Sequence, residues 1–276
     1  MKYFTQPPIG TPLNFSHHLN QGIVGYWPMV EGAGSVTRDM SGKGNNGTLT
    51  NMVQGTTSGW TGGKFGSAMR FDGVNDYVTV PDSDLFSFTD GIRDIPFSLS
   101  FWANPTDFGI NRWVFDKRNN LIGSNEYQVI LGTGGFISLA LFSEDGVAAI
   151  FNSVSTIALI LNAWSHITFT YNGLGTSGIT IYINGVLVPK TIGIFGGTYV
   201  KMNNGNMPLR IGDRNWSAGV AAYAGLLSEI KIYRRMLTAM EVQQLYTDPF
   251  CMYEQKNNFR WFSTFDRKGS FFFSRL

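Results

Sequence analysis

Cysteine and charge are both scarce in this chain. Cys251 is the one cysteine among 276 residues, so no disulfide can form within the chain and no cysteine cluster can bind zinc. Charged residues make up 14% of the sequence, and the formal net charge is +2. That balance gives no general attraction to nucleic acid or to an acidic membrane, so we expect neither as a partner.

Long apolar runs are also missing. No stretch approaches the length of a membrane-spanning helix, and residues 1–8 lack the apolar region of a secretory signal. These absences predict a protein that is made in the cytoplasm without a signal peptide.

Glycine and aromatic side chains are plentiful instead. The chain has 33 glycines, is 14% aromatic and is 43% hydrophobic. Abundant glycine with little charge favours short strands joined by tight turns, and the hydrophobic content is sufficient for a core. A length of 276 residues fits one all-β domain with short appendages.

Local patterns support this class. Phe97, Leu99 and Phe101 alternate with other residues, which puts them on one face of a strand. Asn184-Gly185 separates two β-branched runs and predicts a type I′ hairpin, because both positions tolerate a positive φ.

One helix and two flanking segments complete the expected organisation. Thr238 and Glu241 have the spacing of a capping box and predict a short helix near the end of the domain. We expect an extended N-terminal arm over residues 1–22, a sandwich over 23–250, and an aromatic and basic tail over 251–276.

Five phrases of the sequence, read in order, resemble laminin-G-like, concanavalin-A-like lectin domains, and together they cover roughly residues 22–248. They are Gly25-Tyr26-Trp27 with Glu31-Gly32 and 39–47, then 71–78, 97–102, 164–167 with 181–185, and 225–238. The resemblance implies a jelly-roll β-sandwich of two antiparallel sheets, one short C-terminal helix and extended N- and C-terminal arms. It does not specify a ligand, because this fold hosts lectins, adhesion modules, glycosidase accessory domains and viral surface proteins.

The segments on either side of this domain make the resemblance more specific. Residues 7–10 and 246–252 are similar to the surroundings of such domains in tailed-phage and prophage proteins. The resemblance therefore implies a non-enzymatic virion structural or decoration protein that displays a lectin-like domain and binds host or environmental glycans. A cellular carbohydrate-binding adhesin and a glycoside hydrolase are the alternatives.

Carboxylate spacing argues against the hydrolase. Retaining glycosidases need two carboxylates about 5–5.5 Å apart. The candidate strand places Glu229, Lys231 and Tyr233 on one face, which supplies a single carboxylate. His166 is the remaining candidate base, and we interpret it as a partly buried strand residue. We therefore expect no enzymatic activity.

A structural calcium ion is the cofactor that the resemblance implies, since related domains often carry one. The candidate ligands are Glu31, Asp39, Asp72, Asn75 and Asp76, in loops that match the family's phrases. The family's closing strand often has aspartate where this chain has Ser228, so that position supplies no carboxylate. The alternative is that Asp39 and Asp76 stabilise turns without an ion.

Aromatic side chains in loops are candidate platforms for a sugar. Trp60, Trp113, Trp216 and Tyr223 lie in predicted loops or at strand ends, and ordinary packing is their alternative role. Trp27, Trp102 and Trp164 lie within strand patterns, and we place them in the core.

The tail combines five basic and two acidic residues with a dense set of aromatic side chains. Those assigned to docking are Phe259, Trp261, Phe262, Phe265, Phe271, Phe272 and Phe273. Exposed aromatic clusters mark contact surfaces. The tail therefore predicts a homo-oligomer, or docking onto other virion subunits; folding back onto its own sandwich is the alternative.

Overall fold

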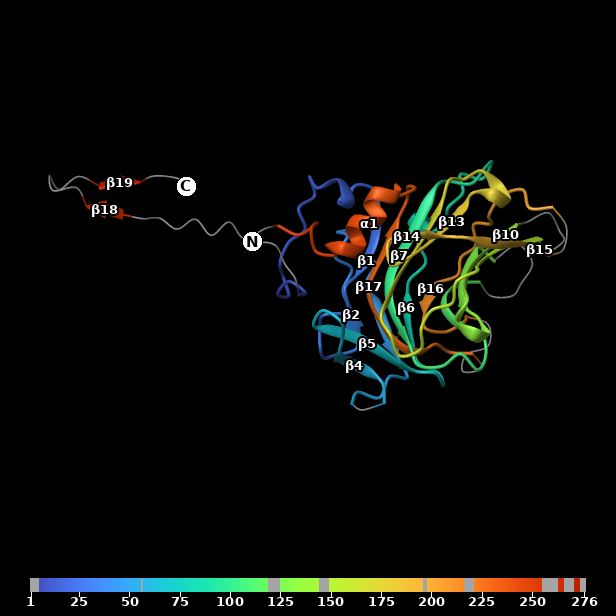
Figure 1. Ribbon diagram of the computed structural model, residues 1–276, viewed down its shortest axis with the longest axis horizontal. Coiled ribbons are helices and arrows are strands. Elements are labelled where there is room, and N and C mark those ends of the chain that lie inside the picture. The colour runs from blue at the N-terminus through green and yellow to red at the C-terminus, as the bar shows by residue number, and fades with distance from the viewer. Residues whose placement is uncertain are drawn as a thin grey trace.

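The computed structural model describes residues 5–55, 57–118, 125–143, 149–195, 198–215 and 221–254, and the backbone of 263–265 and 271–273. The side chains of 149–152, 176 and 194–195 lie outside this description. The chain forms an all-β jelly-roll sandwich of two antiparallel sheets, as predicted (Figure 1).

One sheet has eight strands. Its order is β14 (Val186–Val188), β13 (Ile179–Ile183), β12 (Ser165–Tyr171), β7 (Phe97–Pro105), β17 (Ala224–Tyr233), β5 (Ser67–Asp72) and β4 (Gly59–Gly62), and β1 (Ile23–Trp27) also pairs with β17. This sheet carries the candidate site on its outer face.

The other sheet has nine strands. Its order is β15 (Lys190–Phe195), β11 (Ala149–Ser155), β10 (Ile137–Ser143), β9 (Tyr127–Leu131), β8 (Arg112–Lys117), β16 (Leu209–Ile211), β6 (Tyr77–Val80), β3 (Gly47–Thr50) and β2 (Val36–Thr37). A separate pair joins β18 (Ser263–Phe265) and β19 (Phe271–Phe273).

The main core lies between the two sheets. Phe97, Leu99 and Phe101 of β7 point into it and are at most 1% exposed, which confirms the predicted alternation. Because side chains alternate along a strand, Ser100 and Trp102 point to the opposite side of the same sheet.

That opposite side is covered as well. A second hydrophobic cluster there includes Val242 and Leu245 of the helix α1 (Ala239–Thr247). It also contains Leu13 and Leu19, the latter in the short 3-10 helix η1 (His18–Asn20). In Figure 1 the N-terminal segment lies beside α1 on this side of the sandwich. The outer face is therefore a second buried layer, and residues 5–22 are part of it.

The start of the predicted tail belongs to the same layer. Met252 and Tyr253 are 0% and 4% exposed. The backbone N–H of Asn14 donates to the carbonyl of Met252 at 2.9 Å, and Leu13 bridges to Tyr253. The folded unit thus includes residues 251–254.

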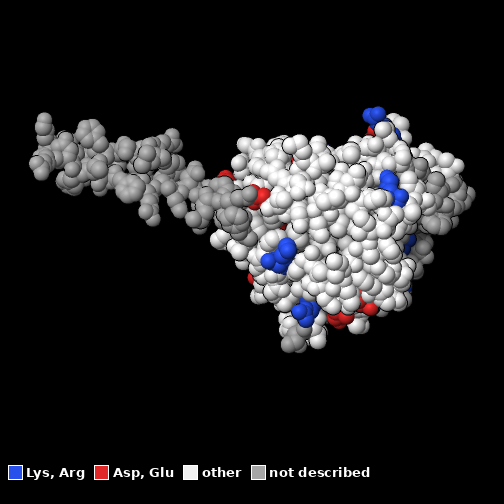
Figure 2. Space-filling view, viewed as in Figure 1, with Lys and Arg blue, Asp and Glu red and all other residues white. Residues whose placement is uncertain are grey.

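The remaining irregular segments include three further 3-10 helices: η2 (Asp84–Phe86), η3 (Thr133–Gly135) and η4 (Gly175–Ser177). No helix in the described part of the chain is long and apolar enough to cross a membrane. Figure 2 shows that lysine, arginine, aspartate and glutamate are sparse on the face in view.

Candidate functional site

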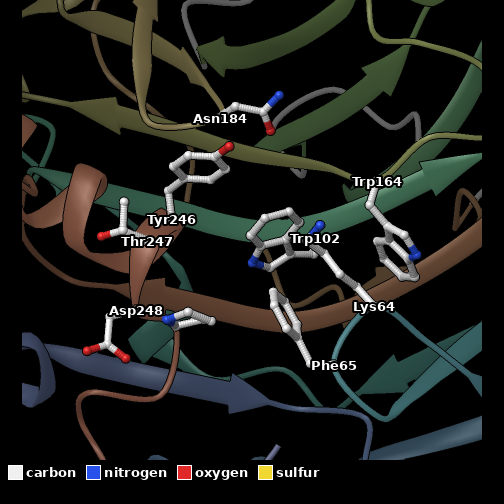
Figure 3. Close-up of a pocket in the computed structure, with 9 residues that line it drawn as sticks. Lys64, Phe65, Trp102, Trp164, Asn184, Tyr246, Thr247 and Asp248 are labelled. Atoms are coloured by element: carbon white, nitrogen blue, oxygen red, sulfur yellow. The ribbon is translucent and has the colours of Figure 1, made fainter. Parts of the chain in front are cut away.

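A groove opens on the outer face of the eight-stranded sheet, beside the C-terminal end of α1 (Figure 3). Its cavity volume is about 400 Å³. The lining residues are Lys64, Phe65, Trp102, Trp164, Asn184, Tyr246, Thr247, Asp248 and Pro249.

Trp102 is the floor of this groove. The alternation of β7 turns its indole away from the main core, and it is 2% exposed. The Phe65 ring meets it edge-on with centroids 5.1 Å apart, and the Tyr246 ring stacks on it at 5.7 Å and an interplanar angle of 23°. Three rings from three elements therefore form one aromatic strip.

Phe65 is held in place by the N-terminal segment. It lies in the turn between β4 and β5, which the hydrogen bond from Gly63 N–H to the Gly66 carbonyl closes at 2.8 Å. The backbone N–H of Gln6 donates to the Phe65 carbonyl at 3.0 Å, and the Gln6 side-chain oxygen accepts from Ser67 N–H at 2.6 Å. Gln6, which is far from Phe65 in the sequence, thus holds in place the wall of the groove that Phe65 forms.

The opposite wall comes from the predicted hairpin turn. Asn184 and Gly185 have φ values of 53° and 77°, which confirms the type I′ turn. A Cβ on Gly185 would lie 3.1 Å from Tyr246 Cδ1, so the turn packs directly against α1. The Asn184 side-chain oxygen also accepts from His166 N–H at 2.9 Å.

Tyr246 is positioned by a helix whose start the sequence predicts. The Thr238 hydroxyl accepts from Glu241 N–H at 3.3 Å, and the Glu241 carboxylate accepts from Thr238 N–H at 2.9 Å. This confirms the capping box. The helix ends at Thr247 and presents Tyr246 and Thr247 to the groove.

His166 lies beside Trp102 on the same face of the sheet, with its ring 5.1 Å from that of Trp102 and 6.1 Å from that of Tyr246, and it is sealed from solvent. It is 2% exposed, and its Nε2 is 2.9 Å from the Ser100 hydroxyl. Burial, followed by the positive charge of Lys231, lowers the pKa of His166 to about 3, so the ring is neutral. This serine–histidine pair cannot meet a substrate, because Ser100 is 1% exposed.

Three buried polar atoms near the floor find no hydrogen-bond partner among the described residues. They are Ser228 Oγ, Trp102 Nε1 and His166 Nδ1. The three residues are direct neighbours across β17, β7 and β12. Buried polar groups are normally satisfied, so this row is a place where ordered water or a ligand would be stabilised.

The groove lacks the paired carboxylates of a glycosidase. Among the described residues that line it, Asp248 carries the one carboxylate. Glu229 is 1% exposed and lies in a separate buried network, where its carboxylate accepts from Tyr26 OH at 2.6 Å and from Lys231 Nζ at 2.9 Å. The described lining of the groove therefore does not supply the carboxylate pair that a retaining glycosidase uses.

The four aromatic residues assigned to glycan contact from the sequence are scattered. Tyr223 is fully buried and Trp60 is 8% exposed, with its indole N–H donating to the Gly34 carbonyl at 2.9 Å. Trp113 is half-buried on the nine-stranded sheet, where its indole N–H donates to the Gln128 side-chain oxygen at 2.9 Å. Trp216 lies outside the described residues.

The groove tryptophans are those assigned to the core. Trp27 is in the main core, Trp102 is buried on the outer face of the sheet, where it forms the floor of the groove, and Trp164 is half-buried and lines the groove. The sequence does contain a signal for the orientation of Trp102. Phe101 faces the main core, so the next residue in the strand must face the outer side of the sheet.

The candidate calcium ligands form two separate groups. Glu31 and Asp39 lie in the loops before and after β2, whereas Asp72 ends β5, and Asn75 and Asp76 lie in the turn that follows it. The described residues hold no cluster of three or more histidine, cysteine, aspartate or glutamate side chains suited to a metal.

Asp39 is already saturated by hydrogen bonds. One carboxylate oxygen accepts from the N–H groups of Tyr26 and Ser41, and the other accepts from the Ser41 hydroxyl and Asn45 N–H, all at 2.8–2.9 Å. Glu31 likewise accepts from Arg38 N–H at 2.6 Å. These hydrogen bonds fit the role of loop anchors, and calcium binding by Glu31 and Asp39 stays a prediction.

The Asp72–Asp76 turn is less saturated. One Asp72 oxygen accepts from Val74 N–H at 2.8 Å and Asn75 N–H at 3.3 Å, and one Asp76 oxygen accepts from Asp72 N–H at 2.9 Å. Burial is the main cause that raises the pKa of Asp76 to about 6, and the nearby Asp72 carboxylate adds to it. Two carboxylates in one turn fit a cation better than the Asp39 loop does.

The docking residues of the tail fall largely outside the described part of the chain. Phe259, Trp261 and Phe262 lie outside it, and only the backbone of Phe265 and of 271–273 is described. That backbone pairs β18 with β19.

A two-sheet jelly roll with an aromatic groove on one outer face defines a lectin-type domain. The sequence profile described as the concanavalin A-like lectin/glucanases superfamily matches residues 72–243. The chain belongs to this superfamily. No curated protein matches the chain.

Solved structures share the fold at low sequence identity. The binding domain of Paraclostridial Mosquitocidal Protein 1 has a TM-score of 0.63 at 19% identity, covering 85% of this chain and 54% of that one. The Botulinum Neurotoxin serotype G binding domain has a TM-score of 0.59 at 18% identity, covering 83% and 51%. The chain thus spans about half the length of these two toxin domains.

A third structure matches over nearly its full length. Domain 4 of AbnA, an extracellular arabinanase from Geobacillus stearothermophilus described in complex with arabinotriose, has a TM-score of 0.58 at 22% identity. The match covers 81% of this chain and 98% of that one. Such identities establish a common fold and leave the ligand open.

Proposed function

We propose that this protein is a non-enzymatic glycan-binding module and that the groove above Trp102 is its sugar site. The aromatic rim carries this proposal. Phe65, Trp164 and Tyr246 are each half-buried and line one cavity. Binding sites for small polar ligands combine such rings with a few fixed polar groups.

The polar groups are present at the same rim. Asn184, Thr247 and Asp248 line the cavity beside the rings and can hydrogen-bond sugar hydroxyls. A domain of the same fold is described in complex with arabinotriose, which supports a sugar ligand for this one.

The test replaces the rim rings. Trp164→Ala and Tyr246→Ala are each expected to weaken binding of the best glycan from an array about fivefold, because each removes a stacking surface worth about 1 kcal/mol. Titration calorimetry measures the affinity. Trp113→Ala, on the other sheet, is the matched control and should bind normally; the reverse pattern would move the site to the nine-stranded sheet.

We also propose a structural calcium ion at the turn formed by Asp72, Asn75 and Asp76. Calcium titration by calorimetry should release heat, and EDTA should lower the melting temperature by a few degrees, because a ligand that binds the folded state stabilises it. Asp76→Asn should abolish this calcium-dependent shift, and Asp39→Asn should retain it. If the titration releases no heat and EDTA leaves the melting temperature unchanged, the proposed calcium site is wrong.

We further propose that the protein is a phage structural or decoration protein and that residues 255–276 dock it onto another particle subunit or a second copy. Support comes from the flanking sequences and from the aromatic content of the tail. The alternative is a cellular adhesin. Recovery of this chain from purified particles favours the first, and an exported longer gene product favours the second.

Truncation after Glu254 tests the docking. Met252 and Tyr253 are buried, so a shortened chain must retain them to keep the outer layer intact. In size-exclusion chromatography with light scattering, we expect the full chain to be an oligomer and the shortened chain a monomer with an unchanged melting temperature. Two monomers with a lower melting temperature for the shortened one would instead indicate that the tail folds back.

A further inference from the structure

We propose that the groove selects ligands that carry a cationic nitrogen, namely the protonated amine of an amino sugar or the quaternary ammonium of a choline substituent. This inference rests on the proposed function, because it specifies the chemistry of the ligand for the same groove. Its starting point is Lys64, whose side chain extends over the Trp102 floor (Figure 3).

The Lys64 ammonium lies where a bound cation would lie. Its Nζ is 4.9 Å from the centroid of the Trp102 ring and 5.7 Å from that of Phe65. Both distances are within the range of about 6 Å over which a cation is attracted to the face of a ring. Lys64 is an exposed residue on a turn, yet its ammonium contacts these rings and forms no ion pair within the described residues.

The surrounding rings form an incomplete cage. Trp102 contacts Phe65 edge-on and Tyr246 by stacking, and Trp164 lines the same cavity. Ring faces carry partial negative charge, and several rings around one point are the usual means by which proteins bind quaternary ammonium groups. The cavity of about 400 Å³ is large enough for a small ligand headgroup.

Apart from Lys64, the charge that lines the groove is negative. The Asp248 carboxylate lines the cavity. Beside Trp102, His166 is neutral, and Lys231 is paired with Glu229, whose carboxylate oxygen is 2.9 Å from Lys231 Nζ. Lys64 is therefore the one positive charge among the described residues that line the groove, and its flexible stem allows the ammonium to turn away from the rings.

Lys64 thus competes with the ligand for the same ring faces. A cationic ligand must displace the lysine ammonium before it binds. Removal of the Lys64 side chain should then strengthen binding of cations, whereas a lysine that held an anionic ligand would have the opposite effect when removed.

Matched pairs of small probes test this by titration calorimetry on the full chain. Choline is compared with its neutral isostere 3,3-dimethylbutan-1-ol, and glucosamine with N-acetylglucosamine. The cationic member of each pair should bind about tenfold more tightly, in keeping with a desolvated cation–π contact. Lys64→Ala should raise the affinity for both cations several-fold, and Lys43→Ala, at an exposed lysine outside the groove, should change nothing.

The outcomes separate this inference from the proposed function. Equal binding within both pairs would overturn cation selection and leave a neutral-sugar site intact. Preference for choline over its isostere without any binding of glucosamine would support the cation site and identify choline as the source of the charge. Weaker cation binding by Lys64→Ala than by the unaltered protein would overturn the inference, and so would the absence of binding of any probe to both proteins. The glycan array tests the sugar site independently of these results.

Discussion

Glu229→Ala is expected to lower the free energy of unfolding by about 3–5 kcal/mol, because it leaves a buried ammonium without its counter-charge. The side chains of Lys231 and Glu229 are 3% and 0% exposed, and their charged atoms are 2.9 Å apart. Urea denaturation followed by tryptophan fluorescence measures the loss, which corresponds to a fall of roughly 10 °C in melting temperature for a domain of this size.

The same substitution should loosen both flanking segments. The Glu229 carboxylate accepts from Gln6 Nε2 at 3.2 Å and from Tyr26 OH at 2.6 Å, and the Tyr253 hydroxyl donates to that of Tyr26 at 2.9 Å. Burial and the negative charge of Glu229 raise the pKa of Tyr26, so its hydroxyl remains a donor at neutral pH. We expect faster proteolysis near residues 6 and 253 in the variant.

Two controls isolate the buried charge. The double variant Glu229→Ala, Lys231→Met removes both charges and should recover most of the lost stability, because an apolar replacement of a buried ion pair is often neutral. Arg93→Ala breaks an ion pair whose arginine is 82% exposed and should cost less than about 0.5 kcal/mol. A single-variant cost below about 1 kcal/mol would contradict the role assigned to the pair.

The parts of the fold that the sequence predicts depend on short-range rules. The alternation of Phe97, Leu99 and Phe101 in β7 follows from the geometry of a few neighbouring residues. The same holds for the turn at Asn184 and for the cap at Thr238. Each of these features could be predicted because no distant segment is needed to form it.

The strands that the sequence does not reveal depend on their partners instead. β4 reads Gly-Trp-Thr-Gly and β2 has two residues, so neither has a recognisable period. They become strands because β5 and β3 supply the hydrogen-bonding groups. Strand propensity within such short segments is too weak to show this.

The groove escapes prediction for a related reason. Alternation gives β7 two faces, but it does not say that the second face is covered by α1 and by residues 5–22, which lie far from β7 in the chain. Trp102 becomes a groove floor only through Phe65 and Tyr246, which contact it from different elements. The role of Asp39 is also difficult to predict from sequence. A carboxylate that accepts hydrogen bonds from backbone N–H groups and one that binds an ion occur in similar loop sequences.

Gly225→Ala is expected to be as damaging as loss of the buried charge, at about 3–5 kcal/mol, for a purely steric reason. Gly225 lies in β17 between β5 and β7 and has a φ of +141°. An added Cβ would meet the Asn104 carbonyl oxygen and would lie 2.9 Å from Pro105 Cα. Both are backbone atoms of the neighbouring strand, so no side chain can move aside, and the central pairing of the sheet must open.

Gly62→Ala is the matched control in an edge strand of the same sheet. A Cβ at Gly62 would find no atom within 4 Å, and the position has no positive φ. Its stability should change by less than about 1 kcal/mol, with a small gain if the reduced freedom of the unfolded chain dominates. Thermal and urea unfolding of the two variants, measured side by side, should therefore differ by several kcal/mol. Equal stabilities would mean that β7 and β17 approach each other less closely at Gly225 than the structure places them.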